Sequence, residues 1–265
     1  MGDEAADSAQ RSWIIAALLL LHLKLTIKTV ITTFGIFRMS IKEPFEIRDG
    51  YVIVDSMVET YAEIAEEAFG QFLFEKANPV PRPQWPSDAT AYDEQESRKT
   101  VSGLKTIVFS AMAIEAAAYE FATIQLGEHL AKSYLDKLDL VGKWLIIPRL
   151  VCGRSVREDG PAINGLKGLV KARNALVHHK STEWDRAGKA EEAMKRRWAS
   201  FDQVQVPNAF KTLILLSLEV NAVLEIDGPL PPFEKGWVFA KRRNALVDEA
   251  VIGCREVHGD NWQRV

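Results

Sequence analysis

The segment from residue 104 to about residue 122 constrains the fold most, because it is a long apolar run with helical spacing, on a helix that we expect to begin near residue 94. One stripe recurs every three or four positions: Leu104, Ile107, Val108, Ala111, Ile114, Ala118, Phe121 and Ala122. The opposite side, which includes Ala113, Ala116 and Ala117, is also apolar and small. A helix that is apolar all round packs inside a bundle, and this one is too long for an ordinary strand. The segment therefore predicts an all-α fold, a helical bundle.

Further helices are predicted after this segment. Asp159-Gly160-Pro161 is a start signal, because proline suits the first turn of a helix, and the helix that follows runs to about residue 179. Residues 184–198 are charged and amphipathic, and Pro207 opens a last apolar helix that ends near residue 227. Four or five helices with short links form a bundle, which we place at residues 94–228.

A smaller appendage is predicted before the bundle, at residues 39–77. Residues 45–48 and 51–54 are predicted to pair as a small hairpin joined by Asp49-Gly50, a pair suited to a type I′ turn. Residues 56–59 form a capping box that opens a helix. Residues 78–93 contain four prolines, which predicts a linker and the main boundary of the chain. Residues 229–265 form a C-terminal tail that the pattern does not place and that we expect to be partly disordered.

The hydrophobic N-terminal segment, residues 1–38, has three interpretations: a packed helix, a weak membrane anchor, or translated sequence before a true start at Met39. Lys24 and Lys28 interrupt the apolar run, and each would cost about 2.5–3.5 kcal/mol at a bilayer centre. A secretory signal is disfavoured because the charged residues before the run are mostly acidic, with Asp3, Glu4 and Asp7 against Arg11. We favour the start at Met39, because the pattern becomes regular only after it.

Charge and cysteine content indicate the compartment and limit the partners. The net charge of −3 gives no global attraction to nucleic acid, so any RNA site must be a local patch. Cys152 and Cys254 lie far apart in no CxxC pair, which fits a reducing cytosol and gives no structural zinc site. No glycine-rich nucleotide motif and no metal-ligand spacing occurs, so we expect no cofactor and no metal.

The candidate site lies on the predicted helix that Pro161 opens. Arg173 falls within the apolar stripe of this helix, where a lone buried guanidinium would be costly, so it must be paired or face a cavity or an interface. Asn174 and His178 are four residues apart and share one face. Glu115, in the stripe of the long helix, is the expected partner of Arg173, and Glu120 is the other candidate. A buried ion pair that only fixes helix register remains the structural alternative.

The charges around this motif favour a phosphate ligand. Between residues 160 and 182 there are four basic residues, Lys167, Lys171, Arg173 and Lys180, and no aspartate or glutamate. Any single lysine is expected to be a solvated side chain on a helix face. The acid-free segment as a whole indicates a local site for RNA or phosphate.

The residues from Arg173 to His178 resemble the R-x4-to-6-H signature of HEPN domains (higher eukaryotes and prokaryotes nucleotide-binding), with the asparagine that often follows the arginine. Residues 110–116 of the long helix and residues 139–144 before the motif helix agree with that resemblance. It covers about half of the chain, roughly residues 94–228.

The resemblance implies a metal-independent endoribonuclease, with toxin or antiviral defence roles, a homodimer and an antitoxin partner among the family's properties. It implies that His178 transfers protons, that Arg173 stabilises charge on the phosphate, and that Asn174 orients either the histidine or the phosphate. The alternative is a non-catalytic HEPN-like helical module that binds a protein partner or a nucleotide. A membrane-tethered protein that uses residues 13–37 is a third, less favoured class.

Overall fold

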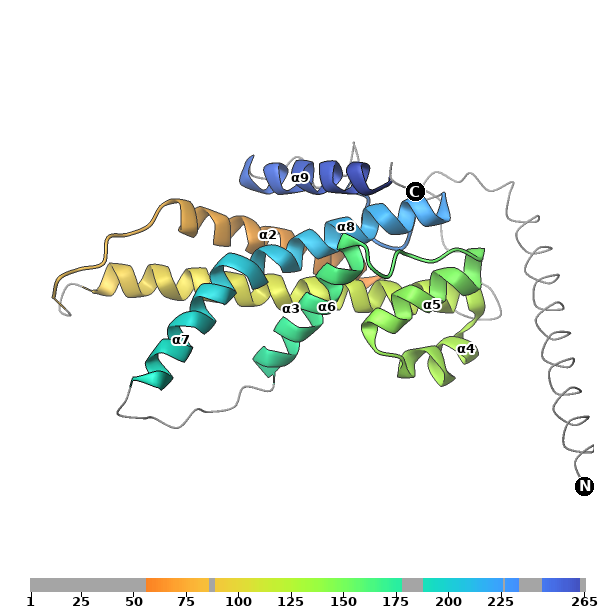
Figure 1. The fold of residues 1–265 in the computed structure, drawn as a ribbon, viewed down its shortest axis with the longest axis horizontal. Helices are drawn as coiled ribbons and strands as arrows, with labels where there is room; N and C mark the ends of the chain where they lie inside the picture. Colours follow the sequence, from red (N-terminus) through yellow and green to blue (C-terminus); the bar gives the residue numbers. More distant parts are fainter. Residues whose placement is uncertain (1–55, 86–88, 178–187, 226, 234–244, 263–265) are drawn as a thin grey trace, which may run out of the picture. The chain divides into compact units, whose positions relative to one another are not determined.

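Every regular element that the computed structural model describes is a helix (Figure 1). The structure describes residues 56–85, 89–177, 188–225, 227–233 and 245–262. The elements are α2 (Met57–Ala77), α3 (Thr90–Leu126), α4 (Glu128–Ser133), the 3-10 helix η2 (Leu135–Lys137), α5 (Leu140–Cys152), α6 (Pro161–Val177), α7 (Lys189–Ser200), the π-helical turn η3 (Phe201–Gln205), α8 (Val206–Leu224) and α9 (Ala245–Trp262). The predicted all-α helical bundle is therefore confirmed for these residues. The predicted hairpin and residues 1–38 lie outside the described residues.

Helix α2 packs along α3 and contributes to the same hydrophobic core (Figure 1). Ser56 is the N-cap of α2, as the capping box predicted, and its Oγ accepts a hydrogen bond from the backbone N–H of Val58. Helix α3 begins at Thr90, inside the segment that was predicted to be the linker. The proline-rich segment thus connects two helices that share one core.

Helix α3 is the longest described element, and its neighbours include α2, α4, α5, α6 and α8. Its buried residues match the predicted stripe and include Ile107, Ala111, Ile114 and Phe121. Among the described residues, α3 alone is long and apolar enough to cross a membrane, but half of its most apolar window is buried inside the protein. A core helix meets the same criteria, so this is weak evidence for a membrane span.

Helix α6 packs closely on α8, because two of its glycines face that helix. A Cβ atom at Gly165 would lie 2.5 Å from Thr212 Oγ1, and one at Gly168 would lie 3.0 Å from Asn208 Nδ2. Asn208 Nδ2 donates a hydrogen bond of 2.9 Å to the Gly165 carbonyl. This contact fixes the first half of α6 against the core. The second half of the helix extends from that anchor and carries the candidate site.

Helices α7 and α8 form one continuous helical segment through the π-helical turn η3. Pro207 was predicted to open a new helix, but it lies in the first turn of α8, directly after η3. Proline has no N–H to donate to the preceding turn, which accounts for the wider π-helical hydrogen bonding at this point. Gly103 of α3 allows Phe201 of η3 to approach closely.

The C-terminal segment contains a helix that the sequence pattern did not place. Helix α9 packs on α8 and α2, and its Val247, Val251 and Cys254 are buried in the core. Phe233, which precedes α9, is also fully buried. These apolar side chains complete the core, so the described part of residues 229–265 packs on the bundle, and partial disorder of the tail stays a prediction for its other residues.

Candidate functional site

The candidate site lies at the C-terminal half of α6, beside α3 and α5. Pro161 begins α6 as predicted, and the helix is anchored by the buried residues Ala162, Ile163, Leu166 and Leu169. Ala172 is the last buried residue, and the side chains beyond it are partly or fully exposed. The end of α6 thus carries the motif away from the core and toward solvent.

The predicted ion pair between Arg173 and Glu115 is present. Arg173 Nη1 donates to Glu115 Oε2 at 2.9 Å and joins α6 to α3. The pair is not buried, however: 29% of the Arg173 side chain and 47% of the Glu115 side chain are exposed. The prediction of a buried pair is wrong, because the stripe position of each residue showed which helix it faces but not that solvent reaches the contact near the end of α6.

The buried charge at this place belongs to Lys143 of α5, whose side chain is only 4% exposed. Its Nζ lies 2.8 Å from Asp136 Oδ1 in η2 and 3.9 Å from Glu115 Oε1. Sequence reasoning did not assign Lys143 to the site. The signal was available, because Lys143 falls among Leu140, Trp144 and Ile147 at helical spacing, where an apolar residue is expected.

Local structure explains why Lys143 points toward α3. Asp139 caps α5 by accepting a hydrogen bond of 2.7 Å from the Gly142 N–H. Trp144 is fully buried, and its Nε1–H donates to the Ile114 carbonyl at 3.3 Å. This bond fixes the start of α5 beside the turn of α3 that carries Glu115. Lys143 is therefore held between two carboxylates by the packing of its neighbour.

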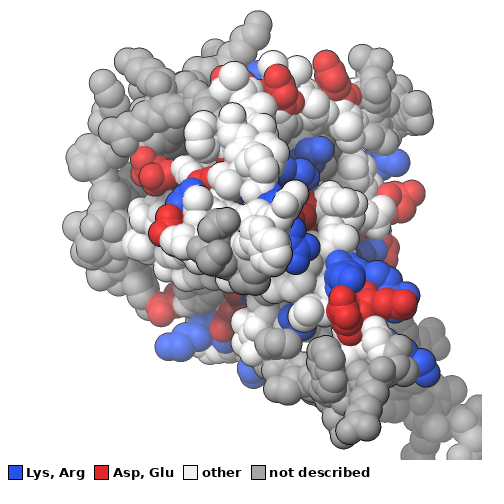
Figure 2. Space-filling view, turned by 90° about the vertical axis from the view of Figure 1, so that its left-hand side faces the viewer, with Lys and Arg blue, Asp and Glu red and all other residues white. Residues whose placement is uncertain are grey.

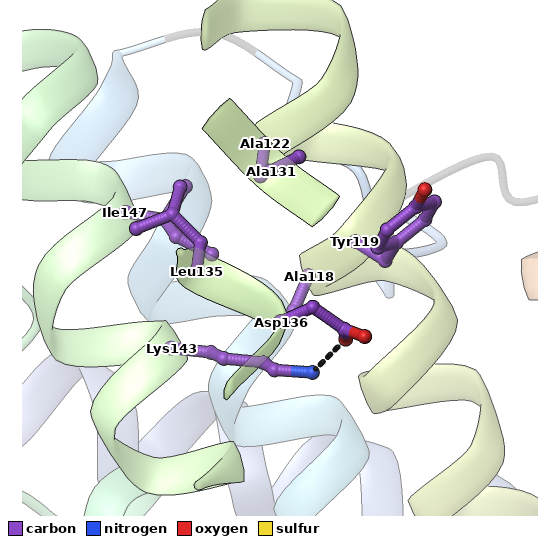
Figure 3. A pocket seen from close by; sticks show the side chains of 8 residues that line it. All are labelled: Ala118, Tyr119, Ala122, Ala131, Leu135, Asp136, Lys143 and Ile147. Atoms are coloured by element: carbon purple, nitrogen blue, oxygen red, sulfur yellow. Dashed lines mark hydrogen bonds and ion pairs between the residues drawn. The ribbon is translucent and has the colours of Figure 1, made fainter. Parts of the chain in front are cut away.

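Four charged residues form a chain of salt bridges with alternating sign, in the order Asp136, Lys143, Glu115 and Arg173, which we call the salt-bridge chain. It runs from η2 through α5 and α3 to α6. Figure 3 shows the end of the salt-bridge chain, where Lys143 Nζ contacts Asp136. Both residues line a small depression, together with Tyr119. The depression has about 150 Å³ of empty space, part of it open solvent. This depression beside the salt-bridge chain is too small for a nucleotide.

The remaining motif residues are exposed or lie outside the described residues. Asn174 is exposed, and its Oδ1 lies 3.4 Å from Arg173 Nη2, which is a long contact. Lys171 is exposed, and Lys167 donates to the Glu158 carbonyl at 3.4 Å. The structure therefore brings Asn174 beside Arg173, whereas Lys167 reaches toward Glu158 and Lys171 is exposed to solvent. His178 and Lys180 lie outside the described residues, directly after the end of α6.

Glu120 is not the partner of Arg173. Its Oε2 accepts a hydrogen bond of 2.8 Å from Ser56 Oγ at the start of α2. Burial raises the pKa of the Glu120 carboxyl above its usual value, while the hydrogen bonds from Ser56 and the backbone of Met57 oppose that shift. Glu120 thus joins α3 to the N-terminus of α2, and the prediction that it supports the candidate site finds no contact in its favour.

One face of the molecule carries a mixed surface charge. On the face that Figure 2 shows, lysine and arginine side chains lie among aspartate and glutamate side chains, and neither sign forms a large continuous patch. Within α7, Lys195 pairs with Glu191 at 2.7 Å. Any attraction for a phosphate therefore depends on individual guanidinium and ammonium groups, as the net charge of the chain already implied.

Three comparisons with known proteins leave the family open. No protein-family model, no curated protein and no solved structure matches the chain significantly. Within the described residues, histidine, cysteine, aspartate and glutamate side chains form no group of three that could hold a metal ion. The resemblance to HEPN domains is thus a hypothesis that depends on the residues of this chain.

Proposed function

We propose that this protein is a metal-independent endoribonuclease of HEPN type, with Arg173, Asn174 and His178 as its catalytic residues. The proposal rests on one observation, that the Arg173 guanidinium is held by an ion pair and is also accessible to solvent. Arg173 is held at 2.9 Å by Glu115, yet 29% of its side chain is exposed, at the helix end that leads directly to His178. A guanidinium that is both fixed and accessible suits a phosphate ligand.

The proposed chemistry is attack of the ribose 2′-oxygen on the adjacent phosphorus. The bond from phosphorus to the 5′-oxygen breaks, and a cyclic phosphate and a 5′-hydroxyl form. His178 accepts the proton of the 2′-hydroxyl or donates one to the leaving oxygen, a contribution of about 10²–10⁴-fold in rate. Arg173 donates hydrogen bonds to the phosphoryl oxygens as charge develops on them. Asn174, beside Arg173, orients the phosphate or the histidine.

The partners and location belong to the same proposal. RNA is the substrate, the protein acts as a cytoplasmic homodimer, and an antitoxin restrains it if it serves as a toxin or defence effector. Lys167, Lys171 and Lys180 are proposed contacts for the RNA backbone, because single basic side chains on one helix and its continuation can follow successive phosphates.

The test is RNA cleavage in excess chelator by the wild type and by His178→Ala and Arg173→Ala. We expect cleavage by the wild type and a loss of at least about 100-fold in each variant. His179→Ala and Arg149→Ala are matched controls, since His179 is the sequence neighbour of the proposed base and Arg149 is an exposed arginine of α5. Equal rates for the wild type, His178→Ala and Arg173→Ala would refute the nuclease.

The second candidate is a non-catalytic helical module that binds a protein partner or a nucleotide. One observation favours it: the Arg173 guanidinium already has a carboxylate partner, as expected of a pair that fixes the register of two helices. If purified wild-type protein leaves RNA intact while Arg173→Ala still folds, this alternative replaces the enzyme.

A further inference from the structure

Lys143 has no role in the proposed cleavage reaction, although it is the most deeply buried charged residue of the salt-bridge chain. Its side chain is 4% exposed, against 29% for Arg173, 47% for Glu115 and 52% for Asp136. A buried ammonium group is costly unless it is paired, and this one has carboxylates on two sides. Figure 3 shows its side chain extending from α5 to reach Asp136. A lysine at this buried position therefore does not serve solubility, and its presence needs another explanation.

The arrangement of charges supplies such a reason. Glu115 lies between two cations, with Oε2 toward Arg173 and Oε1 toward Lys143. Without Lys143, the salt-bridge chain would keep two carboxylates, Glu115 and Asp136, but only one cation, Arg173. The local charge would then be negative, and an approaching phosphate would be repelled. With Lys143 in place the salt-bridge chain has two cations and two carboxylates and is neutral. The exposed edge of Arg173 therefore remains attractive to an anion.

We propose that Lys143 is a positioning residue of an anion-binding site at Arg173: through Glu115 it holds the guanidinium in place and balances its local charge, so that Arg173 can bind a phosphate group. The inference deepens the proposed function, because it rests on Arg173 as the phosphate ligand. It does not require that RNA be cleaved.

The charge balance makes an ordered prediction for two single variants and their combination. Lys143→Met removes a positive charge and fills a similar volume, so it should weaken phosphate binding about tenfold. Asp136→Asn removes a negative charge and should strengthen phosphate binding by a similar factor. The double variant restores neutrality and should bind about as well as the wild type. A merely structural role for the Lys143–Asp136 pair predicts that both single variants weaken binding.

The experiment is a titration of the full-length protein with inorganic phosphate, followed through the Nε–Hε NMR signal of Arg173. That signal is assigned by its loss in Arg173→Lys. Lys132→Met, which removes an exposed lysine of α4, is the control for a general change in net charge. The melting temperature of each variant shows whether it folds. If Lys143→Met is unfolded, Lys143→Arg tests whether a positive charge at this position is sufficient for phosphate binding.

The expected result is an affinity order of Asp136→Asn, then wild type and double variant, then Lys143→Met. Weaker binding in both single variants, equal binding in all of them, or no response of the wild-type Arg173 signal to phosphate would overturn the proposal. RNA cleavage is measured in parallel. If the wild type leaves RNA intact but the affinity order holds, the nuclease fails while the anion site stands.

Discussion

Removing the carboxylate of Glu115 tests how the structure holds Arg173. In Glu115→Ala, Arg173 loses its 2.9 Å partner, but its side chain is already partly solvated and can turn to water. Lys143 keeps its 2.8 Å contact with Asp136. Neither cation is left buried and unpaired, so the loss should be that of an exposed pair, about 0.2–1 kcal/mol in the free energy of unfolding. A buried pair that loses one partner would lose about 3–5 kcal/mol.

The two magnitudes are easily separated by denaturation. For a domain of about 150–250 residues, each kcal/mol shifts the melting temperature by roughly 2–4 °C. We therefore expect a shift of at most about 4 °C for Glu115→Ala. Glu67→Ala, which removes an exposed glutamate of α2, is the matched control. Urea denaturation of Glu115→Ala, Arg173→Met and the double variant gives the coupling free energy, which should also stay below about 1 kcal/mol. A loss of 3 kcal/mol or more would show that the contact is buried and that the argument for an accessible guanidinium is wrong.

Three further substitutions test the packing and a buried carboxyl. A Cβ atom at Gly103 would lie 2.7 Å from Phe201 Cζ, so Gly103→Ala should destabilise the protein by about 1–3 kcal/mol in urea denaturation. Gly253→Ala, where a Cβ meets no atom within 4 Å, should instead stabilise it by about 0.4–1 kcal/mol, and a loss there would contradict the contrast. Burial raises the pKa of Glu219, so its favourable contribution is present below the ordinary glutamate pKa and is lost as pH rises through the raised value. Glu219→Gln should therefore be at least as stable as the wild type at neutral pH, and this relative advantage should diminish in acid. A variant that is less stable at neutral pH and no better in acid would show that the charged carboxylate is needed.

The helices were predictable where one face is uniformly apolar. The stripe through Ile107, Ala111 and Ile114 identified α3, and Pro161 identified the start of α6. The helix α9 was missed because its core contacts are to α8 and α2, which are distant in sequence. The π-helical turn before Pro207 was missed because the sequence does not show that a proline will be accommodated inside a continuing helix.

The candidate site was predictable in part. Helical spacing placed Arg173 toward α3 and correctly suggested Glu115, because both residues interrupt an apolar stripe. Spacing could not show how far solvent penetrates, which depends on where α6 diverges from the core. Lys143 was missed although it also interrupts a stripe, since its burial depends on Asp136 and on the packing of Trp144 against α3. A charged residue at an apolar position was thus the informative signal in all three helices.

The proposed nuclease requires Arg173 and His178 to act together on the phosphate of an RNA chain. The most direct measurement compares an RNA with its 2′-O-methyl counterpart in excess chelator and identifies the new ends by mass spectrometry. We expect cleavage of the unmodified RNA alone, with cyclic phosphate and 5′-hydroxyl ends. Intact RNA, or equal cleavage of the methylated strand, would contradict it.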